Sequence, residues 1–215
     1  MNTEVNRIYN WIPKHARGLL AAVVIYNSLV YYVSRIIASG KPHFDFSLRI
    51  DDSIPFAAWT ILIYWGCYLF WIINYILCSR FDKKQAQRFL SADLLGKTVC
   101  LFFYIFIPTT MSRPDIVGQD IFSVLMRLLY ALDAADNLLP SIHCFVSWMC
   151  YIGMRGDARY SLQYRIFSCL FAVAVCISTL TTKQHVFIDV IAGIVLAEGC
   201  FALTKRMIKQ EEYVA

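Results

Sequence analysis

Charged residues are scarce in this chain, since Asp, Glu, Lys and Arg make up only 16% of its 215 residues. Soluble domains typically carry about 25%. Hydrophobic residues, by contrast, account for 59% of the chain, which is more apolar side chain than a core of this size can bury. These proportions exclude a soluble enzyme, a disordered tail and a nucleic-acid-binding protein with a basic face. They predict an integral membrane protein with a single domain spanning residues 1–215.

The chain also lacks the cysteine spacing of a zinc site and the pattern of a disulfide-rich secreted domain. Its eight cysteines lie almost entirely inside apolar runs, and no two have C-x-x-C spacing. We therefore interpret them as small apolar packing residues. The sequence has no repeat of fixed period, no low-complexity tract and no Gly/Ser linker, so one compact helical bundle is the simplest architecture.

Long apolar runs predict an all-α fold with six transmembrane helices in one bundle. A helix that crosses a membrane needs about 20 mainly apolar residues. Four runs have that length and two are shorter; the expected spans are residues 18–38, 56–77, 94–110, 140–154, 164–182 and 185–203. The first run contains Arg35 and is followed by no small-residue cleavage site, so we expect a retained anchor rather than a signal peptide.

The distribution of Lys and Arg predicts the orientation, because cytoplasmic loops carry the excess of positive charge. With the N-terminus inside, the inner segments hold 13 of these residues and the outer segments 5. The inner residues are Arg7, Lys14, Arg17, Arg80, Lys83, Lys84, Arg88, Arg155, Arg159, Arg165, Lys205, Arg206 and Lys209. The outer residues are Lys41, Arg49, Arg113, Arg127 and Lys183. Both termini are therefore expected in the cytoplasm, and because the charge is spread over four loops we expect no nucleic-acid partner.

Among the four histidines, His185 is a candidate for catalysis because Asp189 follows it by one helical turn. This spacing places both side chains on one helix face. A carboxylate beside an imidazole fixes its tautomer and strengthens the free ring nitrogen as a base or nucleophile. Ionisable groups at membrane depth are costly and commonly functional. The alternative is a structural hydrogen bond at a helix end. His15 and His43 are expected to be merely solvated.

His143 is the second candidate, because it follows Pro140 and Ser141 at the start of an expected span. Proline favours the first position of a helix. The free N–H groups and the positive dipole end of such a helix bind anions, and Ser141 adds a hydroxyl. The expected topology brings the starts of the spans that carry His143 and His185 to the same outer face.

Positive charge and hydroxyl groups are expected at the same face, from Arg113, Lys183 and Ser178. Two histidines, a carboxylate, two cations and two helix ends suit an anion with a transferable centre, and phosphate is the obvious one. The loop of residues 111–139 also holds four aspartates, but their spacing is not that of a compact metal site. We expect no metal ion and no other cofactor, because the side chains supply the countercharge.

Three blocks of this sequence resemble the signature of the phosphatidic acid phosphatase type 2/haloperoxidase superfamily, K-x6-R-P, P-S-G-H and S-R-x5-H-x3-D. The corresponding blocks are Arg113-Pro114, then Pro140-Ser141-Ile142-His143, then Ser178-Thr179 with His185 and Asp189. The resemblance covers residues 94–203, the expected catalytic core. It implies that His185 attacks phosphorus, Asp189 orients it and His143 is the general acid, while Arg113, Ser141, Lys183 and Ser178 bind phosphate.

The chain departs from that signature at three positions. Phe106 stands where the family has lysine, Ile142 replaces the glycine, and Thr179 replaces the second arginine. This altered pattern resembles the divergent branch that includes sphingomyelin synthases and inositol phosphorylceramide synthases, whose members pass a phospho-headgroup to a lipid alcohol. The stretch of residues 49–56 resembles the same branch, without a role for Asp52.

Three functions remain open from the sequence. The first is a lipid phosphatase that hydrolyses a lipid phosphate or diphosphate through a phosphohistidine. The second is a lipid phosphotransferase that uses the same histidines. The third is a non-catalytic membrane protein, and Glu198 within the last span keeps a transport role open. The expected partners are the lipid substrate and the surrounding membrane lipids; the sequence does not determine the oligomeric state.

Overall fold

The computed structural model describes residues 12–214, and helices form nearly all of the regular structure in that range. In chain order the elements are α2 (Lys14–Ala38), β1 (Phe44–Asp45), α3 (Arg49–Ser53), η1 (Ala58–Thr60), α4 (Ile61–Ser79), α5 (Lys83–Phe106), β2 (Thr109–Thr110), α6 (Ile121–Leu132), α7 (Ile142–Arg155), α8 (Leu162–Thr181) and α9 (Phe187–Val214). The all-α fold is therefore confirmed. Arg7, which belongs to the basic residues expected on the inner face, lies outside the described residues.

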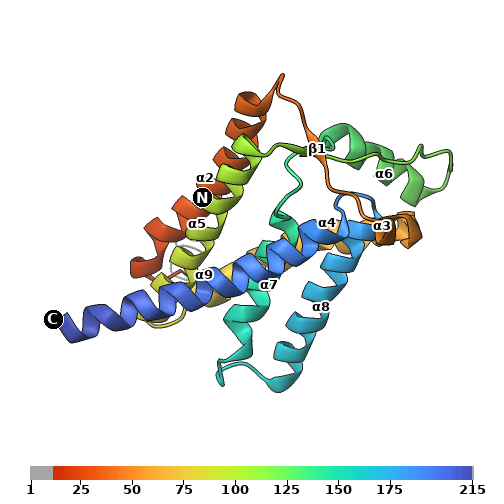
Figure 1. Cartoon of the computed structure of the whole chain (residues 1–215). Helices are drawn as coiled ribbons and strands as arrows, with labels where there is room; N and C mark the ends of the chain where they lie inside the picture. Colours follow the sequence, from red (N-terminus) through yellow and green to blue (C-terminus); the bar gives the residue numbers. More distant parts are fainter. Residues whose placement is uncertain (1–11, 215) are drawn as a thin grey trace, which may run out of the picture.

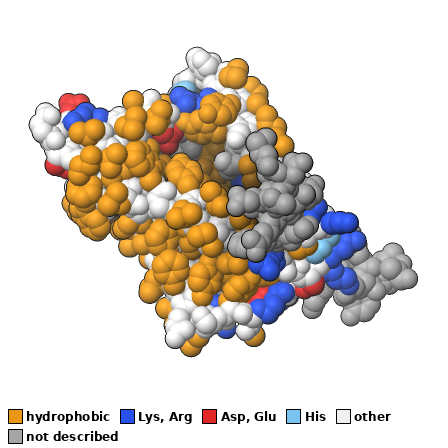
Figure 2. All heavy atoms as spheres, turned by 180° about the vertical axis from the view of Figure 1, so that it is seen from behind, with side chains coloured by type: hydrophobic (Ala, Val, Ile, Leu, Met, Phe, Trp, Pro, Cys, Tyr) orange, Lys and Arg blue, Asp and Glu red, His pale blue; other side chains and the backbone are white. Residues whose placement is uncertain are grey.

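Five helices within residues 12–214 are long and apolar enough to cross a membrane: α2, η1 continued by α4, α5, α8, and α9 as far as Ile208. Figure 1 shows α2 and α5 side by side, with α9 running along the length of the molecule. On the face shown in Figure 2, hydrophobic side chains cover the middle of the molecule and the visible Lys and Arg side chains gather toward its edges. This distribution is that of an integral membrane protein.

The structure does not confirm the expected count of six spans, because α7 falls short. This helix has 14 residues and so measures about 21 Å, against a hydrocarbon core of about 30 Å. This short helix lies inside the bundle, where it packs against α4, α5, α8 and α9. Ten of its residues are buried, so α7 is an internal helix surrounded by longer ones.

The third span differs from the expectation of residues 94–110, because α5 begins at Lys83 and ends at Phe106. Lys97 lies well inside α5. Its Nζ is 2.8 Å from a carboxylate oxygen of Asp93, and the two side chains are 3% and 0% exposed. Tyr75 of α4 donates a hydrogen bond to the same carboxylate. The helix continues through these charges because they neutralise each other within the bundle.

The other helix limits differ from the expected ones by a few residues at most ends. The largest of these differences is at α9, which continues to Val214 instead of ending at residue 203. The eight cysteines are all free, and seven of them are buried, in agreement with a packing role.

Residues 111–139 were expected to form a loop, but they contain the amphipathic helix α6. Asp120 caps this helix by accepting hydrogen bonds from the backbone N–H groups of Phe122 and Ser123. Met126 and Leu129 of α6 pack on Tyr64 of α4. In Figure 1, α6, α3 and β1 lie near the beginning of α9. These short elements therefore cover the end of the bundle that carries the two candidate histidines.

Candidate active site

The structure brings His143 and His185 together from two different helices. His143 lies in the first turn of α7, and His185 comes two residues before α9. Their ring centroids are 5.9 Å apart with an angle of 58° between the ring planes, and the residues are only 8% and 6% exposed. One phosphoryl group placed between these rings would contact both of them.

Hydrogen bonds between backbone groups hold the beginnings of α7 and α9 together. The N–H of Ser141 donates to the carbonyl oxygen of Asp189 at 3.0 Å. The helices approach closely here because α9 has Gly193 at the contact: a Cβ at this position would lie 2.6 Å from the carbonyl oxygen of Ser141. The pairing of the two histidines therefore depends on a glycine one turn after Asp189.

Asp189 faces His185 and is itself held by the backbone. Its Oδ2 lies 3.4 Å from His185 Nδ1 and accepts a hydrogen bond from the N–H of Val186 at 3.0 Å. Asp189 is 1% exposed. The 3.4 Å contact is longer than an ordinary N–H···O hydrogen bond; the carboxylate nevertheless faces one ring nitrogen. Nδ1 of His185 and Oδ1 of Asp189 are buried without a hydrogen-bond partner in the described residues, and the His185 side chain lines a cavity.

The end of α8 and the distant helix α3 fix the backbone around His185. The carbonyl oxygen of Thr179 accepts hydrogen bonds from the N–H groups of Gln184 and His185 at 2.9 and 3.1 Å. At the beginning of α9, Asp51 of α3 accepts a hydrogen bond from the N–H of Phe187 at 2.7 Å. This carboxylate satisfies an N–H group that the helix leaves free, so the α3 segment helps to set where α9 starts.

Arg113 is held beside the histidines by three hydrogen bonds. Its guanidinium donates to the carbonyl oxygens of Asp133 and Ala134 at 2.6 and 3.3 Å, and to Oε1 of Gln184 at 2.9 Å. The same group lies 4.7 Å from the ring centroid of Tyr130 in α6. Burial lowers the pKa of Arg113 from its ordinary value, and burial raises the pKa of Tyr130 to about 12.

A small cavity of about 30 Å³ lies between these groups and is lined by both histidines, Arg113 and Gln184. Two N–H groups in its wall, Nε of Arg113 and Nε2 of Gln184, are buried without a hydrogen-bond partner in the described part of the chain. Buried polar groups are nearly always paired. Unpaired donors beside a guanidinium are suited to an anion.

The sequence did not indicate Tyr64 or Asp133 as parts of the site. The hydroxyl of Tyr64 lies 3.0 Å from Nε2 of His143 and 3.4 Å from a carboxylate oxygen of Asp133. Tyr31 of α2 donates a second hydrogen bond to Asp133 at 2.7 Å. Asp133 was noted only as one of four loop aspartates, and Tyr64 lies within an apolar run where tyrosine is typical. Only the folded chain brings them to His143.

Three residues expected to bind phosphate do not line the cavity. Nζ of Lys183 donates to the carbonyl oxygens of Asp51 and Ile54 at 3.0 and 2.7 Å. The hydroxyl of Ser178 donates to the carbonyl oxygen of its own helix at Val175. Ser141 caps α7, since its side chain accepts a hydrogen bond from a backbone N–H of the first turn. Of the four residues expected to bind phosphate, Arg113 is the one that lines the cavity.

Two of the three positions at which the signature is altered lie apart from the cavity lining. Phe106, which stands in place of a lysine, ends α5 with 64% of its surface exposed and packs against Phe102. Thr179, which stands in place of an arginine, is fully buried and donates its hydroxyl to the carbonyl oxygen of Cys176. Neither position provides a group for phosphate.

The remaining two histidines lie elsewhere. His15 is exposed, and its Nε2 is 3.2 Å from the carbonyl oxygen of Phe81. His43 is exposed, and its Nδ1 is 2.9 Å from the carbonyl oxygen of Lys41. Each therefore makes a local contact at the surface.

Comparisons with known protein families, with curated proteins and with solved structures find no match for this chain.

Proposed function

We propose that this protein is an integral membrane phosphatase that hydrolyses a lipid phosphate or diphosphate through a phosphohistidine. The observation that carries this proposal is the pairing of two buried imidazole rings, 5.9 Å apart, in the wall of a cavity that also holds Arg113. Phosphoryl transfer needs a nucleophile, a proton donor for the leaving oxygen, and positive charge for the equatorial oxygens. The resemblance of the sequence blocks to the phosphatase superfamily supports the same chemistry.

In the first step, Nε2 of His185 attacks phosphorus and the bond from phosphorus to the lipid oxygen breaks. His143 gives its proton to that oxygen, so the lipid leaves as an alcohol (or, from a diphosphate, as the monophosphate) and the phosphoryl group stays on His185. Asp189 stabilises the imidazolium character that develops on His185. Arg113, the amide of Gln184 and the N-terminus of α7 stabilise the charge on the phosphoryl oxygens.

In the second step, water attacks the phosphohistidine. His143, now neutral, accepts a proton from the water, phosphate leaves, and His185 is regenerated. Tyr64 is a positioning residue, because its hydroxyl bridges His143 and Asp133.

Under this proposal the chain crosses the membrane six times, and the short helix α7 is one of the six spans. Residues 137–141 precede it as irregular backbone, but this backbone is bonded within the protein: Thr109 Oγ1 accepts from the N–H groups of Leu138 and Leu139. Irregular backbone is tolerated at membrane depth where protein surrounds it. In this arrangement both termini lie in the cytoplasm and the histidines lie near the extracytoplasmic face, where a lipid headgroup reaches them from the bilayer.

A second function, transfer of the phospho-headgroup to a lipid alcohol, is favoured by the burial of the histidines. Both residues are less than a tenth exposed and line a cavity of only about 30 Å³. A site from which water is largely excluded protects a reactive intermediate from hydrolysis. An alcohol delivered from the bilayer then competes with water for the phosphohistidine.

One experiment separates these functions. Purified full-length protein is incubated with a panel of labelled lipid phosphates, lipid diphosphates and phosphodiester lipids, with and without diacylglycerol or ceramide, in the presence of chelator. Free phosphate is expected from the hydrolase, and labelled acceptor lipid from the phosphotransferase. Denaturation at alkaline pH during turnover should trap a phosphoryl group on His185 that is stable in base and released by acid. If no lipid of the panel reacts and no label is trapped, both functions are wrong.

A further inference from the structure

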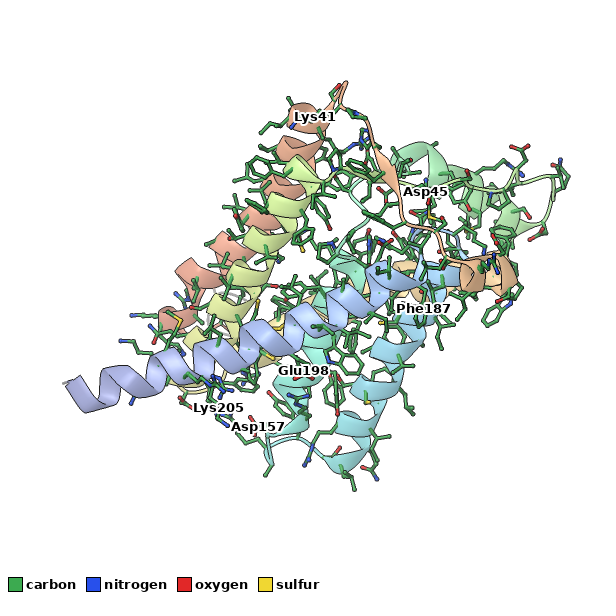
Figure 3. All side chains as sticks on the ribbon, viewed as in Figure 1. Lys41, Asp45, Asp157, Phe187, Glu198 and Lys205 are labelled. Atoms are coloured by element: carbon green, nitrogen blue, oxygen red, sulfur yellow. The ribbon has the colours of Figure 1, made fainter. Side chains whose placement is uncertain are left out.

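A second, larger cavity lies at the other end of the helices that carry the histidines. Its volume is about 460 Å³, and its wall is built from the beginning of α5, the end of α7 and the second half of the span in α9. Arg155 is the last residue of α7, twelve positions after His143, which is about 18 Å along a helix. Figure 3 shows Glu198, Lys205 and Asp157 near one another and far from Phe187, where α9 begins. This cavity is therefore separate from the histidine site.

Two cations in the wall are not neutralised. The guanidinium of Arg88 lies 4.0 Å from the ring centroid of Phe201, and its Nε is buried without a hydrogen-bond partner in the described residues. Lys205, four residues after Phe201 on α9, lines the same cavity and makes no salt bridge or hydrogen bond with a side chain of residues 12–208. Two positive groups thus face one space from α5 and α9.

The carboxylates in the same wall are already paired. Glu198 receives hydrogen bonds from Arg155 on both oxygens, at 2.5 and 2.8 Å, and from Nε1 of Trp148 at 2.9 Å. Asp157 is bonded by the guanidinium of Arg159. Their negative charge is compensated by these partners, so the wall retains the positive charge of Arg88 and Lys205.

The cavity also offers apolar surface beside these cations, from Phe89, Ile152 and Phe201. Basic pockets between membrane helices on the cytoplasmic side are typical binding places for phosphate-bearing lipid headgroups, and the excess of basic residues predicts that this end is cytoplasmic. We propose that the cavity binds a phosphate-bearing anion, with Arg88 and Lys205 as its ligands and the aromatic wall against its apolar part.

The test measures the thermal unfolding midpoint of the purified full-length protein in detergent while short-chain phosphatidylglycerol, phosphatidylcholine or glycerol 3-phosphate is titrated. A ligand of the folded protein raises the midpoint with concentration and so yields an affinity. We expect phosphatidylglycerol to raise the midpoint and phosphatidylcholine not to. Arg88→Gln and Lys205→Gln should each weaken binding about tenfold, as the loss of one charge-assisted hydrogen bond does.

Lys83→Gln is the matched control. It removes a positive charge from the same helix as Arg88, but it does not line the cavity, so binding should be unchanged. If Arg88→Gln does not fold, Lys205→Gln decides, because Lys205 is exposed and its loss leaves the bundle intact. These variants leave ligand binding at the histidine site unchanged. The contribution of that site is therefore the part of the midpoint shift that remains in the variants.

The two phosphate sources give different results. A shift with phosphatidylglycerol alone assigns the cavity to a lipid headgroup, and an equal shift with glycerol 3-phosphate assigns it to a soluble phosphate compound. The proposal is overturned if phosphatidylcholine acts as strongly as phosphatidylglycerol. It is equally overturned if the double variant Arg88→Gln with Lys205→Gln binds as tightly as the unchanged protein.

Discussion

The two ends of the α7–α9 pair differ in how they hold their polar groups. At the histidine end, His143, His185 and Asp189 are each less than a tenth exposed, and the two histidines line a cavity of about 30 Å³. At the opposite end, the side chains of Arg155 and Glu198 are more than a third exposed, beside a cavity of about 460 Å³. The first arrangement is enclosed and its groups are held in place, which suits the stabilisation of charge during phosphoryl transfer. The second is open and suits reversible binding.

The largest effect that this comparison predicts is at His185. His185→Asn should lower lipid phosphate turnover by about 10⁴-fold or more, because it removes the nucleophile. His43→Asn is the control, since His43 is exposed and distant from the cavity, and it should retain full activity. Release of labelled phosphate measures both variants. An active His185→Asn protein would show that the histidine end is not the reaction site.

A smaller loss is expected at His143, which supplies the proton to the leaving oxygen. His143→Asn should lower turnover of a lipid phosphate by about 10²- to 10⁴-fold. A substrate with an acidic leaving group, such as a nitrophenyl phosphate ester, needs little protonation of the leaving oxygen. Its turnover should therefore fall much less in this variant. Comparing the two substrates separates proton donation from a general collapse of the site, in which both would fall equally.

Variants of Arg113 and Lys183 test which of these two cations at the histidine end acts on the substrate. Arg113→Gln should lower turnover by about 10²-fold, as the loss of a charge-stabilising donor does. Lys183→Gln should leave turnover within a few-fold and instead lower the unfolding midpoint, because Nζ of Lys183 holds carbonyl groups of the α3 segment. Equal kinetic losses in the two variants would mean that Lys183 enters the site with substrate.

The smallest effect concerns the packing between α7 and α9. Gly193→Ala should destabilise the protein by about 1–3 kcal/mol, because its Cβ meets the carbonyl oxygen of Ser141. Gly199→Ala lies on the same helix with nothing within 4 Å of the added Cβ, and it should stabilise the helix by about 0.8–1 kcal/mol. Thermal unfolding in detergent measures both. Equal effects would argue against the close contact.

The sequence predicted the helical class and much of the placement of the membrane helices, because long apolar runs depend only on local composition. It also placed His143 and His185 close to the beginnings of two helices, although Pro140 precedes the cap residue Ser141 and His185 precedes the first residue of α9, Phe187. It missed α6, although Asp120 before an amphipathic stretch is an N-cap signal that was there to be used. The limits of α5 were wrong because Asp93 and Lys97 neutralise each other only in the bundle.

The sequence by itself determined that this chain is an apolar helical protein with two histidines at helix beginnings. Tertiary structure decided which polar groups reach them. Lys183 follows α8 and has a φ of 53°, in the left-handed region. Its side chain contacts the α3 segment, while Gln184 lines the cavity. Which of these two side chains faces the cavity depends on one backbone angle and on contacts between residues more than a hundred positions apart. A local sequence pattern does not predict either of these.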